Sequence, residues 1–549
     1  MLDSTSPLRY HIAQNTALIL TSVIFLPLST IILLLSYILR PFLTAQNAQR
    51  RRSLRSPTFK QRTILITGVG MTKGLVLARA FHLAGHNVIG ADFEPYHIPV
   101  SGRFSVSLQK FYTLPQPTVS EGAANYIHSL LHIVRREKID LWISCSGVAS
   151  AIEDGQAQEV LSRRSECMCI QFSASATQTL HSKDTFIQQT LALGLPVPET
   201  HNVISREAVH KVLSQSPRTK KRYIMKSVGV DDANRGDMTI LPQRTLSQTY
   251  NHVSRIPISD QKPWVLQQYI GGGMEYCTHA LIIMGEVKIF VACPSSEMLM
   301  HYEALPRDSS LRKAMLRFTQ EFASRMQAKG KGMTGHLSFD FLVEEVVSET
   351  GTETRLIPIE CNPRAHTAVV LFGEEDGKRV CEAYLSALEG ASRVNDRPEG
   401  RINDTPEAKS NGLTIQTSSL ELNETLIVTP TNPARYYWLP HDLITLVLLP
   451  TFSLVLALLP STAHQQPPRP SIQVSLNTLI SNTNTFTTHL LFWHEGTYAL
   501  YDPLPFWWAC CVYWPSVFAV RLIQLLGLVG QGKGKSSRVN ISTGKVFRC

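Results

Sequence analysis

Acidic and amide side chains occur together in residues 335–368, a stretch with the pattern of a β-hairpin. The segment 336–344 alternates apolar and polar residues, a turn-prone SETGTET follows, and a second strand-like segment covers 355–361. With the turn centred near Thr350, Asp340 lies opposite Glu360, and Ser338 lies opposite Asn362. A β-bulge in either strand would shift this register by one residue.

Two carboxylates at opposed positions need a cation between them. Directly opposed side chains have Cβ atoms roughly 4.5–5.5 Å apart, a distance at which like charges are destabilising. Mg²⁺ takes oxygen ligands, often one or two carboxylates together with substrate phosphates. The spacing therefore predicts a platform for a nucleotide-bound Mg²⁺ or Mn²⁺ ion. The alternative is an exposed hairpin with solvated acids.

Residues 63–92, far upstream of this hairpin, have the pattern of a β-α-β unit. Gly68 and Gly70 fit a dinucleotide-binding turn, but Lys73 stands where the third glycine is expected and Gly74 comes one place late. The unit can therefore belong to a nicotinamide-dependent oxidoreductase or to one of the many doubly wound domains that bind no dinucleotide.

The chain between these two motifs adds further strands. A helix near 122–135 and an apolar strand at 139–145 complete a small parallel domain. A strand at 222–227 carries Lys226, and a loop with Gly and Asp leads to another strand that begins at Met238. Such a hairpin can close over nucleotide phosphates, whereas a lone strand lysine is otherwise simply solvated.

Two more segments precede the acidic hairpin in the chain. Lys183–Glu199 reads as a helix followed by an entry into new structure bounded by prolines. Trp264–Ile270 is an apolar strand that three glycines break, and Glu275 begins a further strand.

Composition limits the class of protein. The 549 residues are 44% hydrophobic and 17% charged, which indicates a folded protein of two or three domains. The formal net charge is +10, but the Lys and Arg excess lies beside hydrophobic segments, which favours an anionic membrane surface over nucleic acid. The ten cysteines show no common metal spacing, and a reduced, cytosol-facing environment is expected.

Three apolar runs indicate contact with a membrane. Ala17–Leu39 is uncharged and long enough to span a bilayer, and the Arg- and Lys-rich segment 40–62 that follows is typical of the cytosolic side. We expect a membrane anchor here; a buried or interfacial helix is the alternative, because Pro27 interrupts the run. The runs Leu443–Leu459 and Tyr501–Val529 either span as a pair or lie in the interface plane, and their internal prolines favour the interface.

With these pieces in order, the chain resembles the ATP-grasp superfamily. Within it, the chain is similar to the mycosporine-glycine synthetase type, the ligase that joins an amino acid to 4-deoxygadusol. The superfamily resemblance rests on Lys183, Lys226, the strand 267–270, Glu275, Asp340 and the segment ECNPR at 360–364. The narrower resemblance rests on the segments GMTKGLVLARAFHLAGHNVI, GRFSVSLQKFYTLP, REKIDLWISCSGVAS, GMEYCTHA, IECNPRAHTA and YDPLPFW. It runs from the first apolar segment to about residue 387 and resumes near 493–518.

The resemblance implies a role for each of these residues. ATP and Mg²⁺ (or Mn²⁺) are the expected cofactors. The implied catalytic residues are Arg364 and Lys226; the implied ATP-binding residues are Lys183, Lys226, Gln267, Gln268, Tyr269, Ile270 and Glu275; the implied metal ligands are Asp340, Glu360 and Asn362. His366 is a weaker candidate for substrate contact.

The resemblance also implies the architecture, an α/β and α+β multidomain protein with membrane-associated terminal segments. A pre-ATP-grasp doubly wound domain is followed by an ATP-grasp fold. The expected division is an anchor and basic segment at 1–62, the pre-ATP-grasp domain at 63–172, the ATP-grasp domain at 173–390, a linker at 391–440, a hydrophobic membrane-associated region at 441–530 and a basic tail at 531–549.

The implied reaction is ATP-dependent joining of a glycine-like amino acid to a 4-deoxygadusol-type cyclohexenone through a phosphorylated intermediate. The same residues could instead serve a carboxylate–amine ligase that acts through an acyl phosphate. Expected partners are these small molecules and membrane lipid, with no nucleic acid and with room for a homodimer. The rival hypotheses are the nicotinamide-dependent oxidoreductase and a membrane scaffold with an inactive ligase domain.

Overall fold

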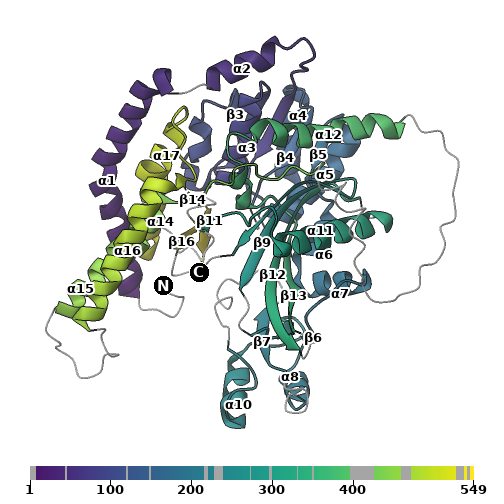
Figure 1. Ribbon diagram of the computed structural model, residues 1–549, viewed down its shortest axis with the longest axis vertical. Helices are drawn as coiled ribbons and strands as arrows, with labels where there is room; N and C mark the ends of the chain where they lie inside the picture. The colour runs from purple at the N-terminus through teal and green to yellow at the C-terminus, as the bar shows by residue number, and fades with distance from the viewer. Residues whose placement is uncertain are drawn as a thin grey trace.

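The computed structural model describes residues 8–43, 46–118, 122–147, 150–215, 221–227, 239–271, 274–295, 300–330, 332–348, 351–395, 426–458, 471–526, 537–540 and 545–548. Two sheets dominate this part of the chain, and a group of apolar helices lies along one side of them (Figure 1).

The first sheet is parallel and has five strands in the order β3-β2-β1-β4-β5. Its strands are β1 Thr63–Thr67, β2 Asn87–Phe93, β3 Lys110–Leu114, β4 Leu141–Ser144 and β5 Met168–Ile170. The helical segments α3 Thr72–Leu83, η1 Pro95–His97, η2 Ser101–Phe104, α4 Ala124–Arg136 and α5 Ala151–Arg164 connect them. Residues 64–66 of β1 are fully buried, as expected for a central parallel strand that is covered on both faces.

The glycines after β1 allow a sharp entry into α3. Gly68 has a φ of +76°, and a Cβ there would lie 2.6 Å from the carbonyl oxygen of Cys145. A Cβ on Gly74 would lie 2.4 Å from the carbonyl oxygen of Gly68. Gly74 therefore allows the close approach of the helix to the turn, one place later than in the dinucleotide pattern.

A second, smaller sheet has the order β6-β8-β7. Its strands β6 Thr200–Val203, β7 Tyr223–Ser227 and β8 Trp264–Gln268 are antiparallel, and α8 Arg206–Leu213 and α10 Leu246–Arg255 pack with them at the lower end of Figure 1. The expected strand from Met238 is wrong in its described part, because only Leu241 pairs, as an isolated bridge to Tyr223. The rest of that expected lid hairpin, 228–238, lies outside the described residues.

The third sheet is antiparallel, with the order β10-β9-β12-β13. Its strands are β9 Glu275–Ile283, β10 Glu286–Pro294, β12 Gly335–Ser348 and β13 Gly351–Asn362. One face packs on α6 Ala174–His181, α7 Lys183–Ala192 and α11 Ser310–Ala328 through an aromatic core. The other face shares a core with β1, α3, η5 Thr367–Phe372 and α12 Gly377–Asn395, and this core joins the sheet to the parallel domain.

The C-terminal region packs against both parts. Short strands β11 His301–Tyr302, β14 Tyr436–Tyr437 and β15 His494–Glu495 form one sheet, and β16 Ser537–Asn540 pairs with β17 Lys545–Arg548. The helical segments are α14 Leu439–Asp442, η6 Leu443–Leu448, α15 Leu449–Leu458, α16 Ile472–Phe492, α17 Leu504–Trp508, η7 Ala509–Tyr513 and α18 Trp514–Leu525.

A buried ion pair fastens this region to the parallel domain. The Asp502 carboxylate is fully buried and accepts hydrogen bonds from Arg79 Nε at 2.9 Å and from Ser105 Oγ at 2.6 Å. Trp438, at the end of the expected linker, is also fully buried and donates to Thr72 Oγ1 at 3.3 Å. Residues 426–438 therefore pack against the body of the protein, whereas 396–425 lie outside the described residues.

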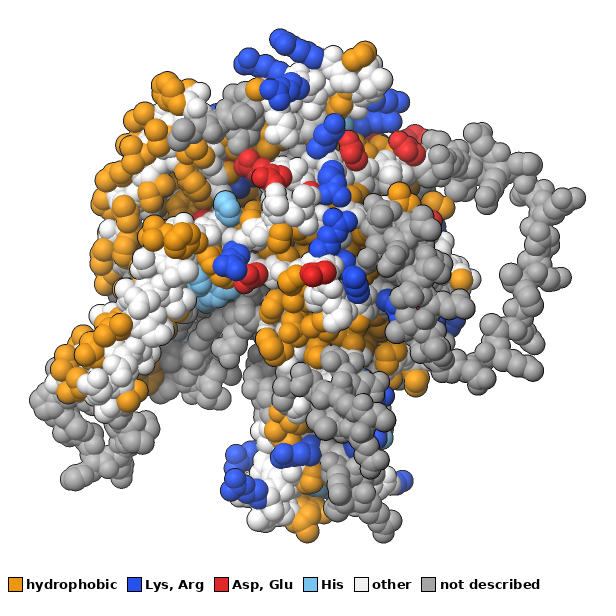
Figure 2. Space-filling view, in the orientation of Figure 1, with side chains coloured by type: hydrophobic (Ala, Val, Ile, Leu, Met, Phe, Trp, Pro, Cys, Tyr) orange, Lys and Arg blue, Asp and Glu red, His pale blue; other side chains and the backbone are white. Residues whose placement is uncertain are grey.

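Two described helices are long and apolar enough to cross a membrane, Leu8–Phe42 and Leu504–Leu525. The first lies within α1 Leu8–Leu43, whose side chains such as Ile24 and Ile38 are exposed, and apolar side chains cover it in Figure 2. The Arg-rich α2 Gln46–Arg55 follows it. The second helix is partly buried and packs along α1, where Trp507 Nε1 donates to Thr30 Oγ1 at 3.1 Å.

The fold class expected from the sequence is confirmed in its α/β and α+β parts. A doubly wound parallel domain is followed by antiparallel sheets, in the expected order along the chain. Helix α16 was not expected, because Asn and β-branched Thr have low helix propensity. Several of its threonine hydroxyls donate to the carbonyl four residues earlier, as Thr478 does to Val474 at 2.8 Å.

Candidate functional site

The predicted pairing of the acidic hairpin is confirmed at the site residues, whereas the predicted register is wrong by one residue between Phe341 and the turn. Asp340 on β12 is paired with Glu360 on β13, and Ser338 is paired with Asn362. These side chains lie on the face opposite the aromatic core, since Leu337, Phe339 and Phe341 face that core. The two carboxylates are only partly buried, so they remain accessible.

A β-bulge sets this register. From the turn inward, Ser348 pairs with Gly351 and Phe341 pairs with Pro358, which would place Asp340 opposite Ile359. The register shifts between Asp340 and Phe341, and this shift brings Glu360 opposite Asp340. Pro358 suits the position, because proline within a sheet is confined to edges and bulges.

Asn362 links the acid pair to Arg364. Its amide nitrogen donates to Asp340 Oδ2 at 3.0 Å, and its amide oxygen accepts from the Arg364 guanidinium. The Arg364 backbone N–H also donates to the Asn362 carbonyl at 2.8 Å. Asn362 therefore positions both neighbours in this arrangement, and its amide oxygen would reach a metal ion only after the amide rotates.

Lys226 lies on β7 with its ammonium group held by Gln267 on β8. The Lys226 Nζ donates to Gln267 Oε1 at 2.8 Å, and Gln267 Nε2 donates onward to Thr200 Oγ1 at 3.4 Å. Burial lowers the pKa of Lys226 to about 8.

The same pKa of Lys226 responds to four other predicted residues. The Glu360, Glu275 and Asp340 carboxylates act to raise it, and the Lys183 ammonium acts to lower it. The structure therefore brings the other four predicted side chains within electrostatic reach of Lys226, although the five come from β7, α7, β9, β12 and β13.

The predicted adenine-binding backbone covers the last two residues of β8 and the two residues after it. The N–H groups of Gln268 and Tyr269 are used within the protein, since they donate at 2.7 Å to the carbonyl oxygens of Glu199 and Arg222. Ile270 is buried, and its N–H has no hydrogen-bond partner in the part of the chain that the structure describes. A ligand could therefore accept a hydrogen bond from the Ile270 N–H.

Lys183 and Glu275 occupy the beginnings of their elements. Lys183 is the first residue of α7 and is partly buried. Glu275 opens β9, is exposed, and accepts a hydrogen bond from Ser295 Oγ at 3.1 Å. Neither side chain is buried, so both remain available to a ligand.

Sequence reasoning missed the role of Lys73. Its side chain is 3% exposed, and its Nζ donates to the carbonyl oxygens of Ser146 at 3.0 Å and Ala365 at 2.7 Å. A lysine thus replaces the third glycine of a dinucleotide turn and ties the parallel domain to the residue after Arg364. The departure from the glycine pattern was the available signal.

Sequence reasoning also missed His279, which lies beside the acid pair, although it named His366. The His279 Nδ1 accepts from the His366 backbone N–H at 3.2 Å. Burial, and then the Lys73 charge, lowers the pKa of His279 to about 3; burial, and then His279 and Arg364, lowers the pKa of His366 well below its usual range. Both rings are therefore neutral at physiological pH. His279 Nε2 and Ser338 Oγ are buried without a hydrogen-bond partner in the described structure.

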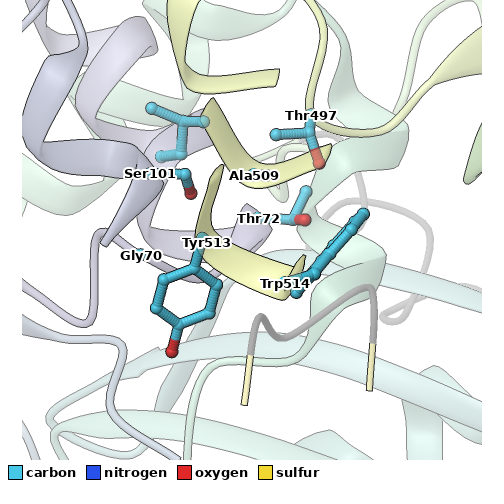
Figure 3. A pocket seen from close by; sticks show the side chains of 8 residues that line it. Gly70, Thr72, Ser101, Thr497, Ala509, Tyr513 and Trp514 are labelled. Carbon is cyan, nitrogen blue, oxygen red and sulfur yellow. The ribbon is translucent and has the colours of Figure 1, made fainter. Parts of the chain in front are cut away.

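The glycine turn after β1 does not form a dinucleotide site. The cavity beside it has a volume of about 10 Å³ and is walled by Gly70, Thr72, Ser101, Tyr513 and Trp514, which Figure 3 shows converging from η2, α3 and the C-terminal helices. That is room for about one water molecule. The Asp92 carboxylate, which a nicotinamide enzyme would use for ribose, instead accepts the Gly70 N–H at 2.8 Å. The geometry therefore does not support the oxidoreductase hypothesis.

Comparison with known proteins gives only distant similarities. No family model matches the chain, and no curated protein matches it in sequence. Among solved structures, it is similar to N5-carboxyaminoimidazole synthetase from Staphylococcus aureus complexed with ADP, at 14% identity and a TM-score of 0.40, over 56% of this chain and 71% of that chain.

Two further solved structures show the same level of similarity. The biotin carboxylase–β-γ-ATP complex from Campylobacter jejuni is 15% identical at a TM-score of 0.43, over 61% of this chain and 72% of that one. N5-carboxyaminoimidazole ribonucleotide synthetase from Thermus thermophilus is 16% identical at a TM-score of 0.38, over 56% of this chain and 72% of that chain. At these scores the similarities support no inference about activity, which has to come from the geometry of the site.

Proposed function

We propose that the protein is an ATP-dependent ligase that forms a carbon–nitrogen bond and releases ADP. The observation that carries the proposal is the pairing of Asp340 with Glu360 on one face, with both carboxylates within electrostatic reach of Lys226. A metal-bound nucleoside triphosphate requires carboxylates that bind the metal ion and ammonium groups that neutralise the phosphates, and the predicted site contains two of each.

The chain's own residues fit Mg²⁺ and ATP. Asp340 and Glu360 would hold the divalent ion, with Asn362 as a third ligand. Lys226 and Lys183 would neutralise phosphate charge, and Gln267 would keep the Lys226 ammonium in place. The unpartnered Ile270 N–H would bind the adenine edge together with the backbone of Gln267–Tyr269, and Glu275 would accept from the ribose hydroxyls.

The reaction would proceed by activation and displacement. Bound ATP would supply the phosphoryl group that makes the acceptor oxygen a leaving group, which the amine nitrogen then displaces as phosphate. Arg364, positioned by Asn362, would stabilise negative charge during the transfer. His279 Nε2 and Ser338 Oγ are buried without hydrogen-bond partners in the described structure beside the acid pair, and they would form hydrogen bonds with polar groups of the acceptor substrate.

The proposed site is compatible with two kinds of acceptor substrate. A 4-deoxygadusol-type cyclohexenone with a glycine-like amino acid agrees with the motif resemblance around GMEYCTHA and IECNPRAHTA. The second candidate is a carboxylate that reacts through an acyl phosphate, which uses the same residues. We further propose that α1 anchors the protein in a membrane with the catalytic part in the cytosol, since its exposed apolar surface is followed by the Arg-rich α2.

The test measures ADP release by the detergent-solubilised full chain with ATP and Mg²⁺. Glycine is combined with 4-deoxygadusol in one arm, and amines are combined with a panel of carboxylates in the other. Release that needs both substrates, with a new ultraviolet-absorbing adduct, supports the first acceptor, and release only in the other arm supports the second. No substrate-dependent ADP in either arm, or equal release by Glu360→Gln, would overturn the proposal. Glu286→Gln is the matched control, because that acid is exposed at the far end of the same sheet.

A further inference from the structure

Three histidines converge on one buried carboxylate, outside the proposed ATP site. Asp442 ends α14 and is fully buried. Its Oδ1 lies 2.7 Å from His301 Nε2 and 3.2 Å from His441 Nδ1, and its Oδ2 lies 2.6 Å from His489 Nδ1. One ligand atom from each of His301, Asp442 and His489 lies within 4.8 Å of the others.

The cluster joins segments that are far apart in the sequence. His301 belongs to β11, Asp442 to α14 and His489 to the last turn of α16. Trp493 covers one side, with its ring centroid 4.4 Å from that of His489. Figure 2 shows histidine side chains where α14 and α16 meet the body of the protein.

The charge of this carboxylate needs compensation. The Asp442 carboxylate is fully buried, so it lies away from the water that would otherwise solvate it. Within the described structure, the ion-pair partners of Asp442 are histidines only, with no Lys or Arg within 4.0 Å. A buried anion of this kind is normally paired with a cation or coordinated to a metal.

We propose that His301, Asp442 and His489 bind a divalent transition metal ion, with Zn²⁺ as the best match and His441 or water as the fourth ligand. Neutral imidazole and carboxylate are the ligands that such an ion prefers, and three protein ligands with one further position form a common zinc arrangement. This proposal goes beyond the ligase function and does not depend on it.

Small movements of the side chains would be enough to admit the ion. Tetrahedral zinc with ligand bonds of about 2.0–2.1 Å places its ligand atoms roughly 3.3 Å apart. The nitrogen–oxygen distances here are 2.6 and 2.7 Å, so these two pairs would separate by a fraction of an ångström as the metal replaces the shared protons. The two imidazole nitrogens lie within 4.8 Å of each other and would move to the same separation. The bound ion would fasten α14 and α16 to β11, beside the parallel domain and the ligase site.

The test uses the full chain, purified in detergent without a polyhistidine tag. Metal content is measured by mass spectrometry after dialysis, and Zn²⁺ is then replaced by Co²⁺ for visible absorption spectroscopy. The wild type is expected to retain about one zinc ion per chain and to show an intense tetrahedral Co²⁺ spectrum. Asp442→Asn and His489→Gln should each lower zinc affinity at least tenfold and abolish that spectrum.

Two controls separate this site from other metal binding. His494→Gln removes an exposed histidine on β15 outside the cluster, and Asp340→Asn removes a proposed Mg²⁺ ligand; both should keep the zinc ion. If Asp442→Asn fails to fold, the melting temperature of the wild type is measured with and without a zinc chelator. The chelator is expected to lower it. Wild-type protein without zinc and without a Co²⁺ spectrum would overturn the proposal. So would a Co²⁺ spectrum that His489→Gln leaves unchanged.

Discussion

Asp340 faces Glu360 across β12 and β13 because β13 contains one extra residue. An uninterrupted ladder from the turn would have placed Asp340 opposite Ile359 and turned Glu360 toward the aromatic core. The bulge next to Pro358 therefore builds the acid pair, and bulges are frequent beside active sites for this reason. The proposed ligase function depends on this one register.

The pKa of Lys226 predicts a pH dependence of ATP binding. Burial lowers this pKa to about 8, so the free protein is partly deprotonated at that pH. Phosphate oxygens favour the charged ammonium and raise the pKa, so binding at pH 8 should take up about half a proton and binding at pH 6 almost none. ATP affinity should fall as the pH rises through 8.

Calorimetry in buffers of different ionisation enthalpy measures this uptake. Lys226→Met is the control, because it removes the titrating group and should remove the buffer dependence attributed to it. If wild type and variant take up the same number of protons at pH 8, Lys226 does not contact the phosphates.

Lys73 should stabilise the junction between the parallel domain and the Arg364 loop. Lys73→Met leaves the carbonyl oxygens of Ser146 and Ala365 without their donor, at a cost of about 1–3 kcal/mol for each buried acceptor. Chemical denaturation should show this loss, and the kcat of ligation should fall because Ala365 follows Arg364. Lys378→Met, at an exposed ion pair on α12, is the matched control and should change stability by less than about 0.5 kcal/mol. Equal stability of the two variants would contradict this role.

The Arg79–Asp502 pair should hold the C-terminal helices to the parallel domain. Both side chains are buried, and removal of one partner leaves an uncompensated charge, so Arg79→Met should destabilise the protein by about 3–5 kcal/mol. Arg435→Met breaks an exposed ion pair with Glu303 and should cost about 0–1 kcal/mol. Thermal unfolding followed by tryptophan fluorescence compares the two. An Arg79→Met variant as stable as Arg435→Met would show that the pair does not hold this region in place.

Much of the site could be predicted from local sequence pattern. The pairing of Asp340 with Glu360 was predicted without the bulge that produces it. The hairpin strands were predicted from their alternation, and the parallel strands β1 and β4 were predicted from apolar runs. These features depend on neighbours in sequence, which a single chain displays directly.

The missed features depend on contacts between distant segments. Lys73 and Ala365 are 292 residues apart, and Asp442 lies 141 residues from His301, so no spacing rule links them. Helix α16 was missed because its stability comes from packing against η6 and α15 rather than from residue propensity. The expected strand from Met238 failed because β8, and not the following segment, supplies the partner of β7.

The most direct test of the ligase site is whether Asp340 and Glu360 hold a metal ion together with ATP. Mn²⁺ binding to the full chain is followed by electron paramagnetic resonance, with and without ATP, in the wild type, Asp340→Asn, Glu360→Gln and the control Glu286→Gln. The wild type and the control should bind Mn²⁺ tightly only when ATP is present, and each site variant should lose at least about tenfold in affinity, or about 1.4 kcal/mol. ATP-dependent Mn²⁺ binding of wild-type strength in both site variants would contradict the account.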